Sequence, residues 1–223
     1  MKIQVEAAEY RAIEAMRDLY RQEANCQIIH DSILRRGLGN PYSIRVDGRM
    51  GGYAGVWNKY HPGRVMEFYV LPHLRAAAQQ VFAQVLAATK AKEMEAQTNM
   101  PLMLLMLQDH AVDIKVENIL FEDALTTSLE CQAGAFRRSR PGDLAGDSIA
   151  DWVIEAGGKV VASGGYLCHY NPPYGDVFMS VEERARRKGF GSFLVQELKR
   201  VCYEAGRRPA ARCNPDNVAS RKT

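Results

Sequence analysis

The chain contains a pattern of residues that occurs twice, and this repeat limits the folds open to it. A shift of 111 residues places Val70 on Val181 and Arg75 on Arg186 (181 − 70 = 186 − 75 = 111). In both copies an apolar, strand-like run precedes the arginine, and apolar residues at helical spacing follow it. Two such segments also resemble each other by chance, but further elements recur in the same order, which favours a repeat. The sequence therefore predicts two similar α/β units.

The repeat defines the elements that we expect in each copy. In the first copy these are a hairpin of residues 42–46 and 52–57 around Asp47-Gly48, a strand at 65–70, a helix at 75–90 and a buried strand at 102–107. In the second copy they are a hairpin of residues 151–155 and 160–168 around Gly157-Gly158, a strand at 177–181, a helix at 192–204 and a strand at 210–213. We also expect an N-terminal helix at about 7–36 and loops near 137–147 and 171–175.

The turn between strand and helix in the second copy carries the clearest functional signal. It reads Arg186-Arg187-Lys188-Gly189-Phe190-Gly191. Glycines permit positive φ angles and a close approach of the backbone to a ligand, and a helix that starts here leaves N–H groups unpaired at its positive end. Three basic side chains add charge at the rim. The pattern predicts a phosphate-binding loop, although a hexapeptide of this kind alone is also compatible with an ordinary solvated turn.

The first copy lacks this feature. Ala78 and Gln80 occupy the positions of the two glycines, and Pro72 lies before the helix. Their Cβ atoms and the proline ring oppose a close backbone approach to a pyrophosphate, so we expect the first copy to be structural.

With its flanks, the second copy resembles the acetyl-CoA-binding core of the GNAT superfamily of acyl-CoA N-acyltransferases. The family loop is Arg/Gln-x-x-Gly-x-Gly/Ala, which residues 186–191 match at every fixed position. Val181 ends the preceding strand as in the family, and Asn217-Val218-Ala219-Ser220 matches a later Asn-x-x-Ala/Ser. The resemblance covers about residues 150–223. It implies the mixed α/β GNAT fold, a largely antiparallel central sheet flanked by helices, in two copies: a degenerate domain at 1–112 without a cofactor loop and a catalytic domain at 113–223.

The resemblance also implies how acetyl-CoA would be held, with no metal. Backbone groups of Met179 and Val181 would pair with the pantetheine arm, and N–H groups from Arg187 to Ser192 would hold the pyrophosphate. The basic side chains would meet the 3′-phosphate. The full set of implied cofactor-binding residues is Met179, Val181, Arg186, Arg187, Lys188, Gly189, Phe190, Gly191, Ser192 and Asn217.

Four residues are candidates for the chemical step. By the resemblance, the N–H of Val181 would polarise the acyl carbonyl, and Asp176 lies near the place of the family's general base, shifted by one position. The alternative for Asp176 is an edge-of-strand carboxylate in solvent. His169 and Tyr170, in a loop stiffened by two prolines, have side chains suited to proton transfer, but they also fit a structural hydrogen-bonding pair.

The sequence departs from the family at its end. The usual general acid is a tyrosine seven residues after the asparagine, which is position 224 here, one beyond Thr223 (217 + 7 = 224). The last two strands of the family fold are missing as well. Either the chain is cut short or the first repeat covers the exposed edge. We expect that the chain is cut short, because an uncovered edge strand is a liability, and the general acid is unassigned.

Composition narrows the classes of function. Hydrophobic residues make up 47% of the 223 residues and charged residues 25%, which is typical of a folded protein. The net charge of +3 is too small to indicate a nucleic-acid partner. Five cysteines, none in a Cys-x-x-Cys pair, argue against a disulfide framework or a zinc site and suggest the reducing cytoplasm. No apolar run approaches membrane-spanning length, so we expect no membrane partner.

Two classes of function remain open. The first is an N-acetyltransferase that moves an acetyl group from acetyl-CoA to a primary amine of an unidentified small-molecule or peptide acceptor. The second is a non-catalytic acyl-CoA-binding or regulatory protein. Nucleotide binding of the P-loop kind is a weaker option, because the Lys-Ser/Thr pair after the last glycine is absent. Single-copy relatives often form dimers, which leaves a homodimer open.

Overall fold

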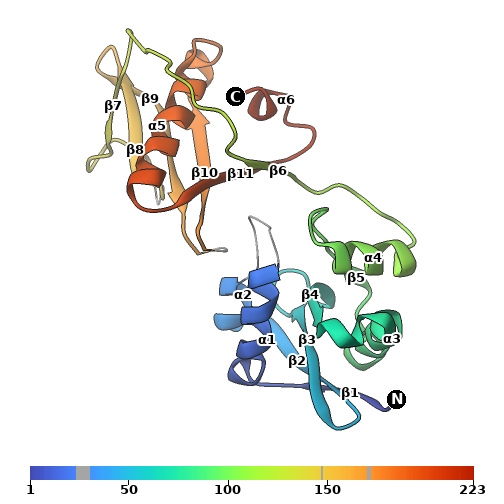
Figure 1. Ribbon diagram of the computed structural model, residues 1–223. Coiled ribbons are helices and arrows are strands. Elements are labelled where there is room, and N and C mark those ends of the chain that lie inside the picture. Colours follow the sequence, from blue (N-terminus) through green and yellow to red (C-terminus); the bar gives the residue numbers. More distant parts are fainter. Residues whose placement is uncertain (24–30, 147, 170–171) are drawn as a thin grey trace. The chain divides into compact units, whose positions relative to one another are not determined.

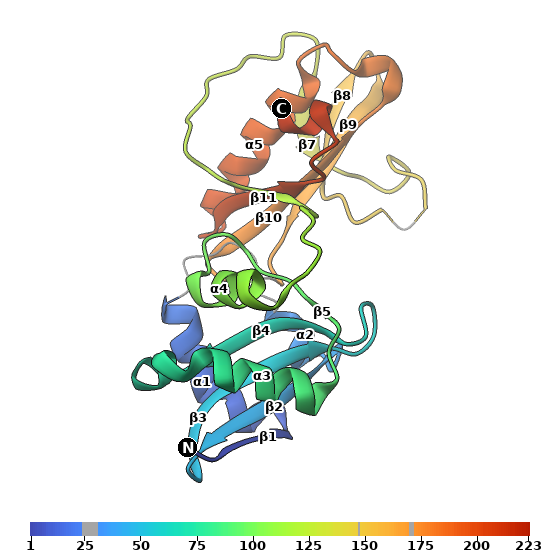
Figure 2. The same ribbon diagram turned by 90° about the vertical axis from the view of Figure 1, so that its right-hand side faces the viewer.

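The computed structural model describes residues 1–23, 31–146, 148–169 and 172–223. The chain forms two compact units, Met1–Ile114 and Lys115–Thr223, and each consists of a sheet with helices packed against it (Figures 1 and 2). Both sheets are mixed but mainly antiparallel. The predicted fold class, a two-copy α/β architecture, is confirmed. No helix in the described ranges is long and apolar enough to cross a membrane.

The first unit contains a five-stranded sheet in the order β1-β2-β3-β4-β5. Its strands are β1 (Ile3–Ala7), β2 (Gly39–Val46), β3 (Arg49–Trp57), β4 (Arg64–Val70) and β5 (Glu93–Met94). Its helices are α1 (Tyr10–Glu23), α2 (Asp31–Arg35), the 3₁₀-helix η1 (Pro72–Ala77), α3 (Ala78–Thr89) and α4 (Pro101–His110). Only the β4–β5 pair is parallel.

The two faces of β4 meet different helices. Phe68 packs against Phe82 of α3, with ring centroids 4.9 Å apart, whereas the neighbouring Glu67 bonds to Arg17 of α1. Successive side chains of a strand point to opposite faces, so α1 and α3 cover opposite sides of this sheet, as Figure 2 shows.

The second unit contains a six-stranded sheet in the order β6-β11-β10-β9-β8-β7. Its strands are β6 (Ile119–Glu122), β7 (Ala135–Arg138), β8 (Trp152–Ala156), β9 (Lys159–Leu167), β10 (Tyr174–Val181) and β11 (Arg208–Cys213). Its helices are the 3₁₀-helix η2 (Glu183–Ala185), α5 (Phe190–Glu204) and α6 (Val218–Arg221). Helix α5 lies along one face of the sheet (Figure 1), where Leu194 and Leu198 are fully buried. Only β10–β11 is parallel.

The predicted hairpins are present in both units because their turn residues adopt the required backbone angles. Asp47 and Gly48 have φ angles of 48° and 81°, and Gly157 and Gly158 have 57° and 72°. Two consecutive positive φ angles define the tight turn that matches the twist of paired strands.

The N-terminal prediction is wrong in part. Residues 3–7 form β1, with Ile3 opposite Val46 in β2, and the helix begins only at Tyr10. Alternation of apolar and polar residues in this stretch suits a strand rather than a helix. The expected loop near 137–147 is also shorter than predicted, because Arg137 and Arg138 belong to β7 and pair with β8.

Residues 102–107 are helical, not a strand as predicted. In α4, Met103 and Met106 are 1% and 0% exposed, whereas Leu105 is 44% exposed. A strand would place Met103 and Leu105 on one face and Met106 on the other, but a helix brings residues three apart together. The segment is apolar at almost every position, so periodicity could not distinguish the two structures.

The outer edge of β11 is covered. The sequence left this edge open, but β6 pairs with β11 in antiparallel register, with Phe121 opposite Ala211. The covering strand comes from the beginning of the second unit, where the sequence predicted no strand. Strand β6 therefore supplies a neighbour for the edge of β11 that the sequence did not predict.

Candidate functional site

Strand β10 separates from β11 before its end. The parallel register runs from Tyr174↔Arg208 to Val177↔Ala211 and stops there, whereas the register with β9 on the other side continues to Val181↔Ala162. Residues 178–181 therefore have a sheet neighbour on one side only. The backbone of this stretch faces a gap in the sheet.

The hydrogen-bonding directions show which main-chain groups face this gap. Glu182 donates its N–H to the carbonyl of Val161 at 2.9 Å, so its N–H points toward β9. N–H groups alternate between the two sides of a strand. The main-chain groups of Met179 and Val181 therefore point away from β9, into the gap, where the resemblance assigned the pantetheine arm.

The loop after β10 has unusual backbone angles. Arg187 has φ 61° and Gly189 has φ 83°, both in the left-handed region. Gly189 is the N-cap of α5, and no side chain caps the helix. Two such residues within three positions bend the loop back over the start of the helix.

This loop leaves a row of N–H groups without partners. Phe193 donates to the carbonyl of Gly189 at 3.0 Å, but within the described residues no hydrogen bond engages the main-chain N–H groups from Arg187 to Ser192. They lie at the positive end of α5. Unpaired amides and a helix N-terminus together form a site for an anion such as a phosphate.

The two glycines of the loop serve different purposes. A Cβ at Gly189 would meet no atom within 4 Å, so the position requires glycine for its φ angle rather than for space. A Cβ at Gly191 would lie 3.4 Å from Cε of Met179 and 3.5 Å from Cγ2 of Val181. The start of α5 therefore lies against side chains of the unpaired end of β10, so the anion site and the gap are adjacent.

The other loop residues divide between anchoring and exposure. Phe190 is 6% exposed and its ring belongs to the apolar core. Its main-chain N–H, and not its side chain, therefore faces the anion site. Arg186, Arg187 and Lys188 are all exposed, and Nε of Arg186 donates to the carbonyl of Val181 at 3.2 Å. Asn217 caps α6, its Oδ1 accepting from the N–H of Ser220 at 3.1 Å.

Asp176 is not a solvent-exposed carboxylate, which was the alternative for this residue. Its exposed fraction is 6%. Oδ2 lies 3.3 Å from Nε of Arg212, and within the part of the chain that the structure describes Oδ1 has no hydrogen-bond partner. Burial raises the pKa of Asp176, and Arg212 opposes this rise in part. A buried carboxylate with a raised pKa is suited to accept a proton near neutral pH.

Asp176 points away from α5. A Cβ at the preceding residue, Gly175, would meet Sγ of Cys202 in α5 at 2.7 Å, and side chains alternate along the strand. His169, another candidate, is exposed just after β9. Tyr170 lies outside the described residues.

The first unit has no equivalent anion site. Helix η1 leads directly into α3, where Ala78 has φ −56° and donates its N–H to Arg75. No residue described between Leu71 and Ala78 has a positive φ. The amides that are unpaired in the second unit are thus partly used within the protein here.

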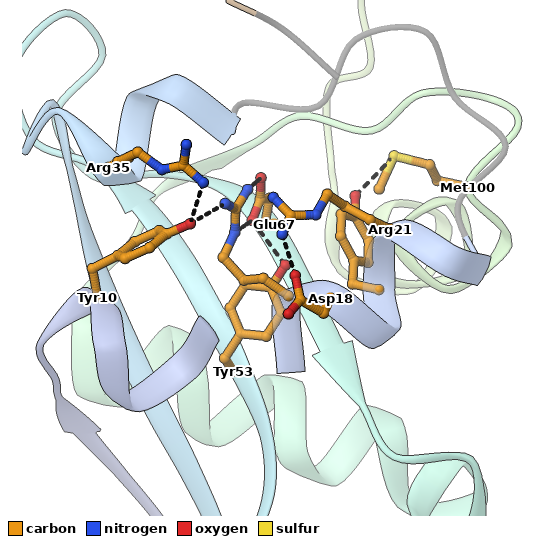
Figure 3. Close-up of polar contacts among 9 residues, drawn as sticks. Tyr10, Asp18, Arg21, Arg35, Tyr53, Glu67 and Met100 are labelled. Atoms are coloured by element: carbon orange, nitrogen blue, oxygen red, sulfur yellow. Dashed lines mark hydrogen bonds and ion pairs between the residues drawn. The ribbon is translucent and has the colours of Figure 1, made fainter. Parts of the chain in front are cut away.

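The first unit instead buries a polar cluster on the other face of its sheet (Figure 3). Nε and Nη2 of Arg17 donate to the two carboxylate oxygens of Glu67 at 3.0 and 2.8 Å, and Tyr53 donates to Oε2 at 2.8 Å. Burial and the Glu67 carboxylate raise the pKa of Tyr53 well above its usual value. This cluster was not predicted from the sequence, although a glutamate inside an apolar run signals a buried partner.

No group of three or more histidine, cysteine, aspartate or glutamate side chains within the described ranges could hold a metal ion.

Comparison with known proteins identifies both units. The model "Acetyltransferase (GNAT) domain" matches residues 10–124, and "Acetyltransferase (GNAT) family" matches residues 116–223. No curated protein sequence matches the chain.

Solved structures share the fold over nearly the whole chain. An acetyltransferase of the GNAT family from Colwellia psychrerythraea has a TM-score of 0.77 at 13% identity, covering 98% of this chain and 92% of that one. A tandem GNAT protein from the clavulanic acid biosynthesis pathway has a TM-score of 0.61 at 11% identity, covering 99% and 93%. A GCN5-related N-acetyltransferase from Sphaerobacter thermophilus has a TM-score of 0.57 at 15% identity, covering 97% and 88%.

Proposed function

The chain belongs to the GNAT acetyltransferase family, and from this premise we propose that its second unit transfers an acetyl group from acetyl-CoA to a primary amine. The first unit is the degenerate copy and has a structural role. The acceptor is a small molecule or a peptide, and its identity is the question for experiment.

One observation carries the proposal: the unpartnered N–H groups from Arg187 to Ser192 lie beside the unpaired end of β10. A diphosphate needs convergent donors, and an extended amide-containing arm needs a free strand edge. The loop supplies the convergent donors, and the main-chain groups of Met179 and Val181 supply the free strand edge beside it. Arg187 and Lys188 add positive charge at the rim, and Asn217 lies at the start of α6 as a further contact.

Different residues of the second unit perform different parts of the proposed acetyl transfer. Bound acetyl-CoA supplies the acetyl group as an activated thioester. The N–H of Val181 faces the gap and donates to the acyl oxygen, which stabilises negative charge there. The carboxylate of Asp176 takes the proton from the acceptor ammonium, because its burial raises its pKa. The free amine then bonds to the acyl carbon as the C–S bond breaks, and CoA leaves as a thiolate that takes up a proton from solvent. His169 and Tyr170 are second candidates for proton transfer.

Binding and turnover are measured separately. Calorimetry with CoA and acetyl-CoA tests the anion site, and Gly189→Trp, which fills the loop with an indole ring, is expected to abolish binding. Release of free CoA is then followed with a panel of amines that includes amino acids, polyamines, aminoglycosides and peptides. No binding to the wild-type protein excludes the proposal. Binding without turnover on any acceptor supports the non-catalytic alternative.

A further inference from the structure

The guanidinium of Arg186 makes a contact that differs from those of its basic neighbours. Its Nε donates to the main-chain carbonyl of Val181 at 3.2 Å. All three basic side chains, Arg186, Arg187 and Lys188, are exposed, so this hydrogen bond and not burial sets Arg186 apart. The same position in the first unit, Arg75, pairs with the carboxylate of Glu23 and lies over the ring of Tyr69, 5.8 Å from its centroid. Arg186 therefore contacts the strand itself, where its counterpart contacts side chains.

The hydrogen bond from Arg186 reaches the Val181–Glu182 peptide group from the side that faces the gap. The peptide that joins Val181 to Glu182 is bound on the β9 side, where Glu182 donates to Val161 at 2.9 Å. On the side of the gap, no strand in the described part of the chain pairs with this peptide, because the register with β11 ends at Val177. Among the described residues, the carbonyl of Val181 accepts a hydrogen bond on its open side from Arg186.

The orientation of this peptide matters for the neighbouring N–H. The φ and ψ angles of Val181 link the held peptide to the one that carries the Val181 N–H, which faces the gap. A carbonyl oxygen has two lone pairs, so the bond from Arg186 leaves one free for a ligand. An N–H group that stabilises negative charge on an acyl oxygen must already point at that oxygen before the reaction, because reorienting the group would cost part of the stabilisation.

We propose that Arg186 is a positioning residue: its Nε–H fixes the last peptide of β10 and thereby aims the Val181 N–H into the gap. This inference rests on the proposed function, in which that N–H donates to the acyl oxygen of acetyl-CoA. It assigns to Arg186 a role in orienting a donor rather than the contact with phosphate charge that a basic loop residue would otherwise have.

Three substitutions separate the donor from the charge. In Arg186→Gln the amide nitrogen is the same number of bonds from Cα as Nε, so the donor stays and the charge is lost. Arg186→Lys keeps the charge but places its nitrogen one bond further out. Arg186→Met has a similar length with neither charge nor donor. Circular dichroism and thermal melting establish that each variant is folded.

The readout is the carbonyl stretching band of bound [1-¹³C]acetyl-CoA in difference infrared spectra, together with the Kd for acetyl-CoA. A hydrogen bond to the carbonyl lowers the frequency of this band. We expect the lowered band in the wild-type protein and in Arg186→Gln, whose Kd rises by about threefold for one screened charge. In Arg186→Met the frequency of the band returns at least halfway to its value in free acetyl-CoA. In Arg186→Lys the frequency returns in part, although the Kd for acetyl-CoA stays at the wild-type value.

The outcomes distinguish this inference from the proposed function. If the wild-type protein does not bind acetyl-CoA, both fail. If it binds and the band is lowered equally in all four proteins, while Kd follows the charge, then Arg186 is a charge contact only and the inference is overturned. If Arg186→Met is unstable, the comparison of Arg186→Gln with Arg186→Lys decides alone, since a band that is lowered equally in these two contradicts it.

Discussion

Arg17 of α1 and Glu67 of β4 meet in the interior of the first unit with Nη2 and Oε1 2.8 Å apart, and their side chains are 0% and 1% exposed. The guanidinium uses Nε for the second carboxylate oxygen, and Tyr53 adds a third hydrogen bond. A buried pair of this kind costs much desolvation, which its own contacts offset.

Removing one partner should therefore be severe. Arg17→Met leaves the Glu67 carboxylate buried without its counter-charge, and we expect a loss of about 3–5 kcal/mol in the free energy of unfolding. Hydrogen exchange of peptides from β3 and β4 measures this loss locally. Replacing the cluster together, as Arg17→Met, Glu67→Met and Tyr53→Phe, should recover most of it, and a loss below about 1 kcal/mol in the single variant would contradict the account.

A pair of matched glycine substitutions tests the anion site. Gly189→Ala and Gly158→Ala both place a Cβ in open space at a positive φ, 83° and 72°. Each should cost about 1 kcal/mol of stability, because the left-handed region is unfavourable for alanine. Only Gly189→Ala should weaken the binding of CoA in calorimetry, since Gly158 lies in a hairpin turn. Equal affinities for CoA in the two variants would contradict the assignment of the loop as the anion site.

Asp176 gives the stability of the protein a defined dependence on pH. Its pKa is raised in the folded chain, so the folded state binds the proton more tightly than the unfolded state. The stability that protonation of Asp176 contributes is fully present below the pKa of the unfolded chain, near 3.8. It is lost as the pH rises through the raised pKa of the folded chain. Asp176→Asn should therefore melt higher than the wild-type protein at pH 7, and the difference should shrink at pH 4.

The control for this prediction is Asp216→Asn, which alters an exposed carboxylate of the same unit. Its melting temperature should follow that of the wild-type protein across the same pH series. A melting temperature of Asp176→Asn below that of the wild-type protein at pH 7 would show that the Arg212 contact outweighs the cost of burial.

Arg187 holds a backbone conformation that glycine adopts more readily, with φ 61°. Arg187→Gly should relieve this strain by about 1 kcal/mol, partly offset by the greater flexibility of glycine in the unfolded chain. The melting temperature should stay equal or rise, while the affinity for CoA falls and depends less on salt. Lys188→Gly, at a position without a positive φ, should lower the melting temperature instead.

Alanine substitutions in α4 test the helical register. Met106→Ala removes a side chain that is 0% exposed and should cost about 2–5 kcal/mol in urea unfolding. Leu105→Ala, at a position that is 44% exposed, should cost less than about 1 kcal/mol. Similar losses at both positions would mean that the segment is buried on all sides.

Local chemistry explains which parts of the fold could be predicted. Asp47-Gly48 fixes its turn through its own backbone preferences, and Gly206 ends α5 with φ 70°, so neither depends on distant residues. The backbone of the proposed phosphate-binding loop was predictable for the same reason, because its glycines and the helix that follows lie within a few positions of one another.

Features that depend on distant partners were missed. The four residues of β6 are a strand only because β11, far along the chain, pairs with them, and the apolar run in α4 has no period of its own. The burial of Asp176 likewise depends on how the sheet packs and on Arg212. The geometry that joins Arg186 to Val181 could not be read from the basic run, since three adjacent cations look alike in a sequence.

The position of β6 in the sheet also affects how the protein is made. A ribosome releases residues 119–122 long before residues 208–213, yet these two segments pair directly. During that interval the nascent β6 has no partner, and its apolar residues and open edge are exposed to other chains. Completion of the second sheet must therefore await the synthesis of residues 208–213, and until then the edge of β6 is open to contacts with other chains.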